Sequence, residues 1–308
     1  MNTNKTVYLF IILLILSSPM IFSKPPVIDI KLSKNVYLES EPIWLEINVN
    51  IDKEIIVDKT PAIFPFCGDI KFVLLNEFDD TLKGHYCVSG DGIYTEYSYH
   101  LDHYYLIYDI LNLYEKIEDF PNSQLIMKYK LLPGNYRLLA IISLMINKKF
   151  EKYFSNKVLF KVEEPFGIET EAHKDLIDIE DFAVNGDSDK NVRFEGTCKK
   201  VNYYKEKYSN SVYLDKAEHE IISWGVFFSN FKDTVTSYIF NRLSENPENY
   251  YNFQYVRSLG YLYKNNDALL RYTLTQISES EKGTLLQKII DNYFEEKEAM
   301  KQFEMKKN

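Results

Sequence analysis

The chain has 308 residues, of which 45 are acidic and 36 are basic, so its net charge is −9. An acidic balance of this size argues against a nucleic-acid backbone or an anionic membrane surface as the main partner. The length exceeds that of a usual single core and predicts two domains, and the hydrophobic content of 45% excludes a chain that is disordered throughout.

The first residues have the pattern of an export signal. Lys5 precedes an unbroken apolar run, residues 7–16, which ends in Ser-Ser-Pro, and Ser23 is a small residue suited to cleavage. We therefore predict a signal peptide over residues 1–23 and an exported chain that is periplasmic, bound at the cell surface or extracellular. A membrane span needs about twenty apolar residues, so no permanent span is predicted. A buried N-terminal helix is the alternative.

Export affects how the cysteines are interpreted. Cys67 and Cys87 both lie in the first half of the chain, and an oxidising compartment would allow them to form a disulfide. Closing that loop would contribute about 3 kcal/mol to stability. Two buried thiols in separate strands are the alternative. Cys198 has no neighbour of the type that activates a thiol, so we take it as inert.

Alternating hydrophobicity predicts β-structure up to residue 164. In the clearest run, residues 36–51, one face is apolar (Ile43, Leu45, Ile47, Val49, Ile51) and the other is polar (Glu46, Asn48, Asn50). This pattern predicts one buried face and one solvated face. Further strands are predicted at residues 27–32, 55–57, 69–75, 92–99, 125–131, 131–142 and 157–162. Seven or eight short antiparallel strands predict a sandwich of the immunoglobulin type over residues 24–164.

Three motifs in this half carry a resemblance. They are Val-Tyr-Leu-x-x-Glu-Pro-Ile at residues 36–43, Leu-Pro-Gly-x-Tyr at 132–136 and Ser-Asn-x-Val at 155–158. Together they resemble the Ig-like β-sandwich of exported bacterial proteins, over roughly residues 25–163. The resemblance implies a fold and says little about activity. The Cys-Trp-Cys spacing of antibody domains is absent, so the similarity is one of architecture.

A longer segment at residues 98–122 separates the early strands from the late ones. Apolar residues recur there at three- and four-residue steps (Leu106, Ile107, Ile110, Leu111, Tyr114). This spacing predicts one short helix across the end of the sandwich. A strand is the alternative for the same run.

After Pro165 and Gly167 the hydrophobic period changes to about 3.6, which predicts an all-helical domain over residues 165–308. The first helix is expected from Ile168, and the polar residues 181–193 are expected to form an exposed loop. The remaining helices are predicted at residues 199–207, 214–228, 231–243, 253–263, 268–277 and 285–300.

The helical half contains a weak internal repeat. A Ser-Asn-Ser-Val turn leads to Tyr213, and an Asn-Pro-Glu-Asn turn leads to Tyr250 and Tyr251 about 38 residues later. Such a turn, followed by a helix with a small residue, here Ala217, at its packing point, resembles the helix pairs of tetratricopeptide (TPR) proteins over residues 198–300. The period exceeds the usual 34, and the consensus residues are only partly present. A plain bundle of α-helical hairpins is the alternative.

Motifs for catalysis are absent. The one close histidine pair, His100 and His103, would face one side on a helical turn and could then bind a metal, but would face opposite sides on a strand. The acidic loop from Asp187 begins like a calcium loop, but Val192 and Cys198 replace the required Gly and Glu, so a solvated loop is favoured. No catalytic, cofactor-binding or metal-binding residue is assigned.

These observations predict an exported, non-catalytic binding protein of the cell envelope or extracellular space. Its partner is expected to be another protein or an envelope glycan, and no cofactor is expected. One alternative is a carbohydrate-binding or carbohydrate-cleaving protein, in which Trp44, Tyr97 and Tyr99 would form an exposed platform. Another is a metal-dependent hydrolase that uses His100 and His103.

Overall fold

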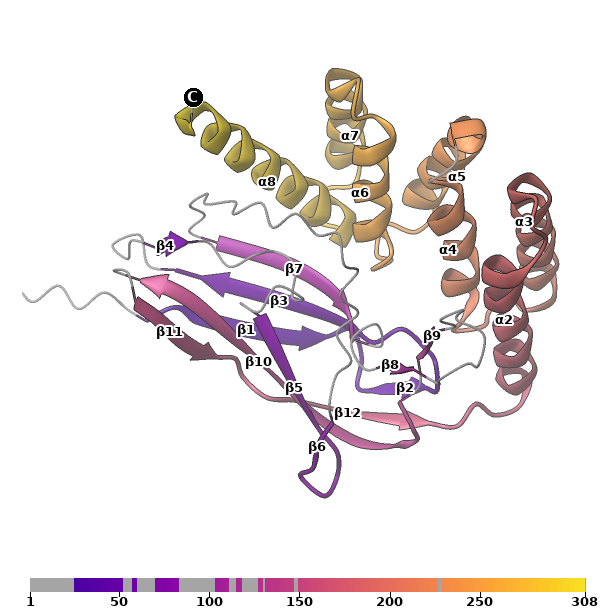
Figure 1. Ribbon diagram of the computed structural model, residues 1–308, viewed down its shortest axis with the longest axis horizontal. Coiled ribbons are helices and arrows are strands. Elements are labelled where there is room, and N and C mark those ends of the chain that lie inside the picture. The colour runs from indigo at the N-terminus through magenta and orange to yellow at the C-terminus, as the bar shows by residue number, and fades with distance from the viewer. Residues whose placement is uncertain are drawn as a thin grey trace, which may run out of the picture.

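The computed structural model describes residues 25–51, 57–59, 70–82, 103–110, 115–117, 127–129, 131–146, 149–226 and 229–307. A strand-rich region built mainly from antiparallel sheets is followed by an all-helical region (Figure 1). The last strand ends at Glu163 and the first described helix begins at Ile168, so the change of period in the sequence coincides with the change of structure.

The smaller sheet has the order β1-β3-β7, from strands Val27–Leu32, Trp44–Asn50 and His103–Asp109. All its pairs are antiparallel, and Ile47 lies opposite Ile30 on one side and Leu106 on the other. Residues 106–109, expected in a short helix, are therefore in a strand. The helical spacing misled because Ile107, on the face of this strand toward the helices, is itself buried, so apolar residues are not confined to every second position.

The larger sheet has the order β2-β12-β10-β5-β6, and β4 and β11 also pair with β10. Its strands are Val36–Leu38 (β2), Val57–Lys59 (β4), Ile70–Leu75 (β5), Thr81–Leu82 (β6), Gly134–Ile146 (β10), Lys149–Phe154 (β11) and Val158–Glu163 (β12). The β2–β12 pair is parallel and the others are antiparallel. A separate pair joins Glu115–Ile117 (β8) to Met127–Tyr129 (β9).

One hydrophobic core lies between the two sheets. It is filled by every second residue of the strands, including Ile28, Ile30 and Leu32 of β1 and Leu138, Ala140, Ile142 and Leu144 of β10. At the start of β10 the hydroxyl of Tyr136 donates a hydrogen bond to the carbonyl oxygen of Leu132 at 2.5 Å. The Leu-Pro-Gly-x-Tyr motif thus fixes the turn that enters the central strand.

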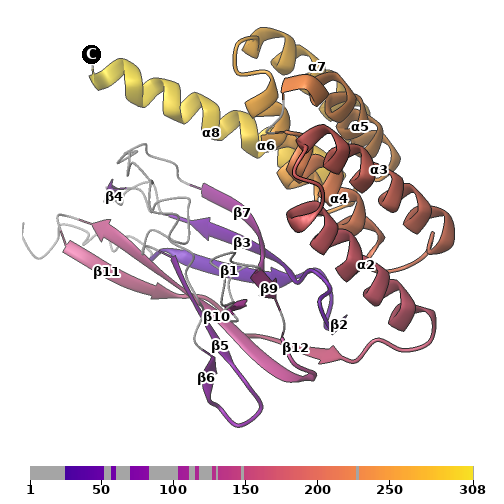
Figure 2. The same ribbon diagram turned by 45° about the vertical axis from the view of Figure 1, so that its right-hand side comes forward.

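Helices that follow one another in the chain lie side by side and form a row along the strand-rich half (Figures 1 and 2). They are Ile168–Asn185 (α2), Lys190–Lys207 (α3), Leu214–Gly225 (α4), Lys232–Glu245 (α5), Asn252–Leu262 (α6), Asp267–Ser280 (α7) and Leu285–Lys307 (α8). Contacts also join α2 to α4 and α6 to α8, so in these two places a helix packs against the next helix but one.

The predicted exposed loop at residues 181–193 is mostly helical. Helix α2 continues to Asn185 and α3 begins at Lys190, which leaves only residues 186–189 between them. Helix α3 starts there because the side chain of Asp189 accepts a hydrogen bond from the backbone N–H of Asn191 at 2.8 Å. The polar composition of this segment therefore reflects a capped helix start and not a long loop.

A second hydrophobic core joins the helices to the smaller sheet. Besides residues of the helices it contains Trp44, Tyr105 and Ile107, which lie on the face of the sheet that points away from the first core. The polar face expected to be solvated is therefore partly covered, and Glu46 on that face is only 7% exposed. Burial of the apolar side chains on this face stabilises the contact. This gain outweighs the cost of removing the carboxylate of Glu46 from water.

Candidate functional site

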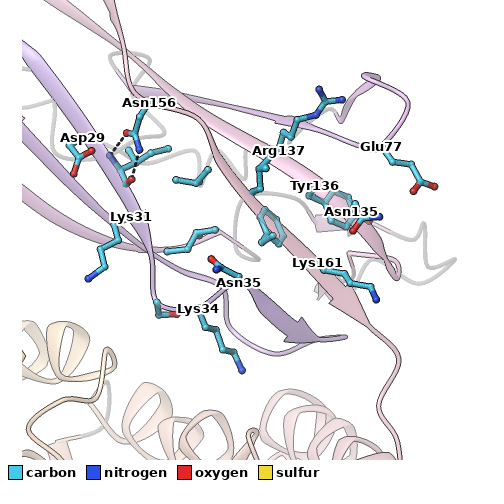
Figure 3. A pocket seen from close by; sticks show the side chains of 16 residues that line it. Asp29, Lys31, Lys34, Asn35, Glu77, Asn135, Tyr136, Arg137, Asn156 and Lys161 are labelled. Carbon is cyan, nitrogen blue, oxygen red and sulfur yellow. Dashed lines mark hydrogen bonds between the residues drawn. The ribbon is translucent and has the colours of Figure 1, made fainter.

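A surface groove of about 1210 Å³ lies at the open side of the strand-rich half (Figure 3). The edge of β1 and the crossing that leads to β2 form one wall, and β12 with the start of β10 forms the other. The lining residues are Asp29, Ile30, Lys31, Leu32, Ser33, Lys34, Asn35, Glu77, Asn135, Tyr136, Arg137, Asn156, Val158, Leu159, Phe160 and Lys161. The groove therefore lies where the edge strand β1 of one sheet faces the part of β12 that β2 does not pair.

Hydrogen bonds close the groove at both ends. At one end the side chain of Asn156 accepts from the N–H of Ile30 at 2.7 Å and donates to its carbonyl oxygen at 2.9 Å (Figure 3). At the other end the N–H of Lys161 donates to the carbonyl oxygen of Asn35 at 2.9 Å. Between these two points, no backbone hydrogen bond joins β1 to β12 among the described residues.

The backbone of both walls points into the groove. Ser33 donates its N–H to Trp44 of β3, so the peptide groups of the alternate residues Ile30 and Leu32 point away from β3. Lys161 donates toward Asn35, and by the same alternation the N–H and C=O of Leu159 point away from β10. The side chain of Leu159 is 64% exposed.

The charges around the groove are largely balanced. Three of its four lining cations form ion pairs, namely Lys34 with Glu41, Arg137 with Asp79 and Lys161 with Glu163. The fourth, Lys31, lies on the same strand as Asp29, while Glu77 lies at the opposite side of the groove (Figure 3). The groove therefore does not offer the excess of positive charge that a phosphate or a polyanion would need.

A second polar cluster fixes the helices against the smaller sheet. The carboxylate of Glu46 accepts hydrogen bonds from the hydroxyls of Tyr250 at 2.7 Å and Tyr105 at 3.0 Å, and it pairs with Lys288 at 3.3 Å. Burial alone would raise the pKa of Glu46, but the bonds from Tyr250, Lys288 and Tyr105 outweigh it and lower the pKa. Glu46 on β3 is therefore an ionised carboxylate that joins β7, the turn before α6 and helix α8.

The turn after β2 makes another polar contact with the helices. Tyr213 donates its hydroxyl to the carbonyl oxygen of Glu39 at 2.7 Å, and Lys216 reaches the carbonyl oxygen of Ser40 at 3.2 Å. Glu41 shapes this turn because its carboxylate accepts from the N–H of Leu38 at 2.9 Å. The Tyr-Leu-x-x-Glu-Pro motif thus builds a docking turn for α4.

The aromatic residue proposed for a carbohydrate platform is not at the surface. Trp44 is 7% exposed, and its ring contacts Tyr251 edge-on at 4.8 Å and stacks on Tyr250 at 6.2 Å. Tyr97 and Tyr99, which the platform also requires, lie outside the described residues. Trp44 therefore serves the contact between sheet and helices and is excluded from an exposed platform.

Several other predicted residues are also outside the described ranges. These are the signal peptide at residues 1–23, the disulfide candidates Cys67 and Cys87, and His100. His103 is the first residue of β7. Within the described ranges, no group of three or more His, Cys, Asp or Glu side chains is placed to hold a metal ion.

The loop that begins like a calcium site has another role. The carboxylate of Asp187 accepts from the N–H of Asp189 at 2.8 Å, and Asp189 in turn caps α3. These bonds use the oxygens for local turns. The thiol of Cys198 is half-buried and its pKa is raised by burial, in agreement with an unreactive cysteine.

Comparison of the chain with protein-family models, with curated proteins and with solved structures gives no match. Among the helices that the structure describes, none is long and apolar enough to cross a bilayer.

The groove and the Glu46 cluster were not found by reasoning from the sequence. The Ser-Asn-x-Val and Tyr-Leu-x-x-Glu-Pro motifs were the available signals, but a motif does not reveal which distant backbone its side chains will bind.

Proposed function

We propose that this chain is an exported, non-catalytic binding protein of the cell envelope or extracellular space, with an Ig-like sandwich and a TPR-like helical array. Its partner is another macromolecule, a protein or an envelope glycan. The groove between β1 and β12 is the observation that carries the proposal, because it is a recess at the surface lined by backbone and side chains that could contact a partner. The apolar run at residues 7–16 supports export.

Three features support the Ig-like assignment. The strand order β1-β3-β7 faces β2-β12-β10-β5-β6 across one core. The first part of the chain contributes one strand to each sheet. Strand β1 pairs antiparallel with β3, and β2 pairs parallel with the last strand, β12. Tyr136, near the start of β10, bonds the backbone four residues upstream in the manner of a tyrosine corner.

The TPR-like assignment rests on how the helix pairs stack. Tyr213 and Tyr251, 38 residues apart, each immediately precede the first helix of a pair. Neighbouring pairs approach closely at glycines: a Cβ built on Gly225 of α4 would lie 2.7 Å from the ring of Phe194 on α3, and one on Gly260 of α6 would clash with the Tyr293 hydroxyl of α8. Small residues at such crossings are what stacked helix pairs require. A plain bundle of hairpins remains the alternative.

The proposal is tested with the full chain, because the second core contains residues of both halves. A photo-crosslinking amino acid is placed at Leu159 in the groove and, as a matched control, at Tyr272, which is 66% exposed on α7. Each protein is incubated with envelope extract and, separately, with an array of envelope glycans. We expect a partner that crosslinks through position 159 and not through 272. Equal labelling from both positions, or none, would contradict binding at the groove.

A further inference from the structure

Part of the unused hydrogen-bonding capacity of the groove belongs to the backbone. On β12 the N–H and C=O of Leu159 point into the groove, and on β1 those of Leu32 do so. Within the described part of the chain, no residue forms a hydrogen bond with these four groups. Exposed edge groups of this kind pair readily with the backbone of another chain.

The neighbouring edge position already binds an amide. Asn156 presents a carboxamide that accepts from the N–H of Ile30 at 2.7 Å and donates to its C=O at 2.9 Å. These are the two bonds that one residue of a paired strand would make. The edge of β1 is thus shown to accept a peptide-like group from a neighbour at the position next to Leu32.

The groove also continues an existing strand pairing. Strand β2 pairs with β12 only from Lys161 onward, so the preceding residues of β12, at positions 158–160, have a partner on the β10 side alone. A segment that adds here would extend the line of β2. Between Asn156 and Lys161 the edge has room for about four residues at roughly 3.3 Å each.

From these observations we infer that the groove takes a short extended segment of a partner polypeptide, which pairs through its backbone with Leu159 in line with β2. The inference rests on the proposed binding function and names the partner class. The exposed Leu159 side chain supplies apolar contact, while the ion pairs of Lys34, Arg137 and Lys161 leave little net charge for recognition. Recognition by backbone is tolerant of sequence and only weakly sensitive to salt.

The test uses random dodecapeptides displayed on phage, selected on the full chain, with the enriched peptide then synthesised and its affinity measured. Leu159→Pro removes the N–H that would bond the peptide, and it spares the β12–β10 ladder because that N–H points away from β10. Leu159→Ala keeps the N–H and removes only side-chain contact. We expect Leu159→Pro to weaken binding about tenfold and Leu159→Ala about threefold or less.

A second measurement needs no variant. Amide hydrogen exchange of Leu159 in the unaltered chain should slow on addition of the peptide, because a new hydrogen bond protects that amide. Enrichment of peptides that bind without slowing this amide, or an equal loss of affinity in Leu159→Pro and Leu159→Ala, would overturn the inference.

The two proposals fail in different ways. If no peptide is enriched but crosslinking at Leu159 captures a glycan or a folded protein surface, the extended-segment inference is wrong and the binding function stands. If no peptide is enriched and crosslinking at Leu159 captures nothing above the Tyr272 control, both are wrong. An affinity that falls steeply between about 0.1 M and 0.5 M salt would point to charge recognition and would also count against the inference.

Discussion

Tyr213 and Tyr251 hold equivalent places in two successive helix pairs, and both contact the strand-rich half. Each precedes the first residue of a helix, α4 or α6. Tyr213 donates its hydroxyl to the carbonyl oxygen of Glu39, while the ring of Tyr251 packs edge-on against Trp44 at 4.8 Å. One buried tyrosine before α4 and one before α6 thus contact the strand-rich half, 38 residues apart in the chain. These two residues attach the helices to the strands at two separate points.

Glu46 should be the most sensitive polar residue of that attachment. Glu46→Gln keeps the shape of the side chain but removes the charge that Tyr250, Tyr105 and Lys288 bind. Charge-assisted hydrogen bonds contribute about 1.5–3 kcal/mol each, so we expect a loss of about 2 kcal/mol in the free energy of unfolding, measured in urea. Glu298→Gln is the matched control, because its pair with Arg271 is at the surface and should change stability by less than about 1 kcal/mol. Equal effects of the two substitutions would refute this role of Glu46.

The lowered pKa of Glu46 gives this attachment a pH dependence of known sign. A carboxyl group whose pKa is lower in the folded chain stabilises the fold above its unfolded value, and this contribution disappears as the pH falls through the folded value. The attachment should therefore weaken as the pH falls below about 4.5. Tryptophan fluorescence would report the change, since Trp44 lies in the contact. In Glu46→Gln this acid-induced step should be absent or smaller.

The contribution of Glu220 to stability should depend on pH in the opposite sense to that of Glu46. Burial, together with the nearby carboxylate of Glu180, raises its pKa to about 7, although Lys216 partly offsets this. A raised carboxyl pKa means that the folded chain binds the proton more tightly than the unfolded chain. The stabilising contribution is thus complete below about pH 4.5 and is lost as the pH rises toward 7. Thermal melting between pH 5 and pH 8 should show a decline that Glu220→Gln removes. A decline of the same slope in Glu220→Gln would assign the effect to another group.

Where α6 crosses α8, the effect of Gly260→Ala on the free energy of unfolding should depend on the hydroxyl of Tyr293. A Cβ on Gly260 would lie 2.3 Å from the Tyr293 hydroxyl oxygen, and that oxygen is buried without a hydrogen-bond partner among the described residues. Gly260→Ala should therefore destabilise the chain by about 1–2 kcal/mol in spite of its better helix propensity. With Tyr293→Phe in place, ring carbons still lie 3.1 and 3.3 Å from that Cβ, so the same substitution should cost clearly less stability but should not become stabilising. A double-mutant cycle by chemical denaturation measures this coupling, and additive effects would show that the hydroxyl is not the obstacle.

The sequence was sufficient for patterns that depend on one element at a time. The alternation of Ile28, Ile30 and Leu32 predicted β1 as Val27–Leu32, and the change of period after Pro165 located the start of the helices. It could not predict relations between distant elements. Glu46 was expected in water because its strand alternates, yet helices that lie some 200 residues later in the chain cover it. Likewise, the Asn156 motif indicates a turn, while its bond to Ile30 depends on how two sheets meet.

Substitutions of Asn156 test how strongly its two hydrogen bonds to Ile30 hold the two sheets together. Asn156→Ala removes both hydrogen bonds to Ile30 and should lower the free energy of unfolding by about 1–3 kcal/mol. Asn156→Asp keeps an acceptor for the N–H of Ile30 but places a second oxygen against its carbonyl, so it should be no better than alanine despite its similar size. Hydrogen exchange at the Ile30 amide should accelerate most in Asn156→Ala, because only there is the acceptor lost. If Asn156→Asp were as stable as the unaltered chain, the bond to the Ile30 carbonyl would contribute nothing, and the two edges would be joined by a single hydrogen bond.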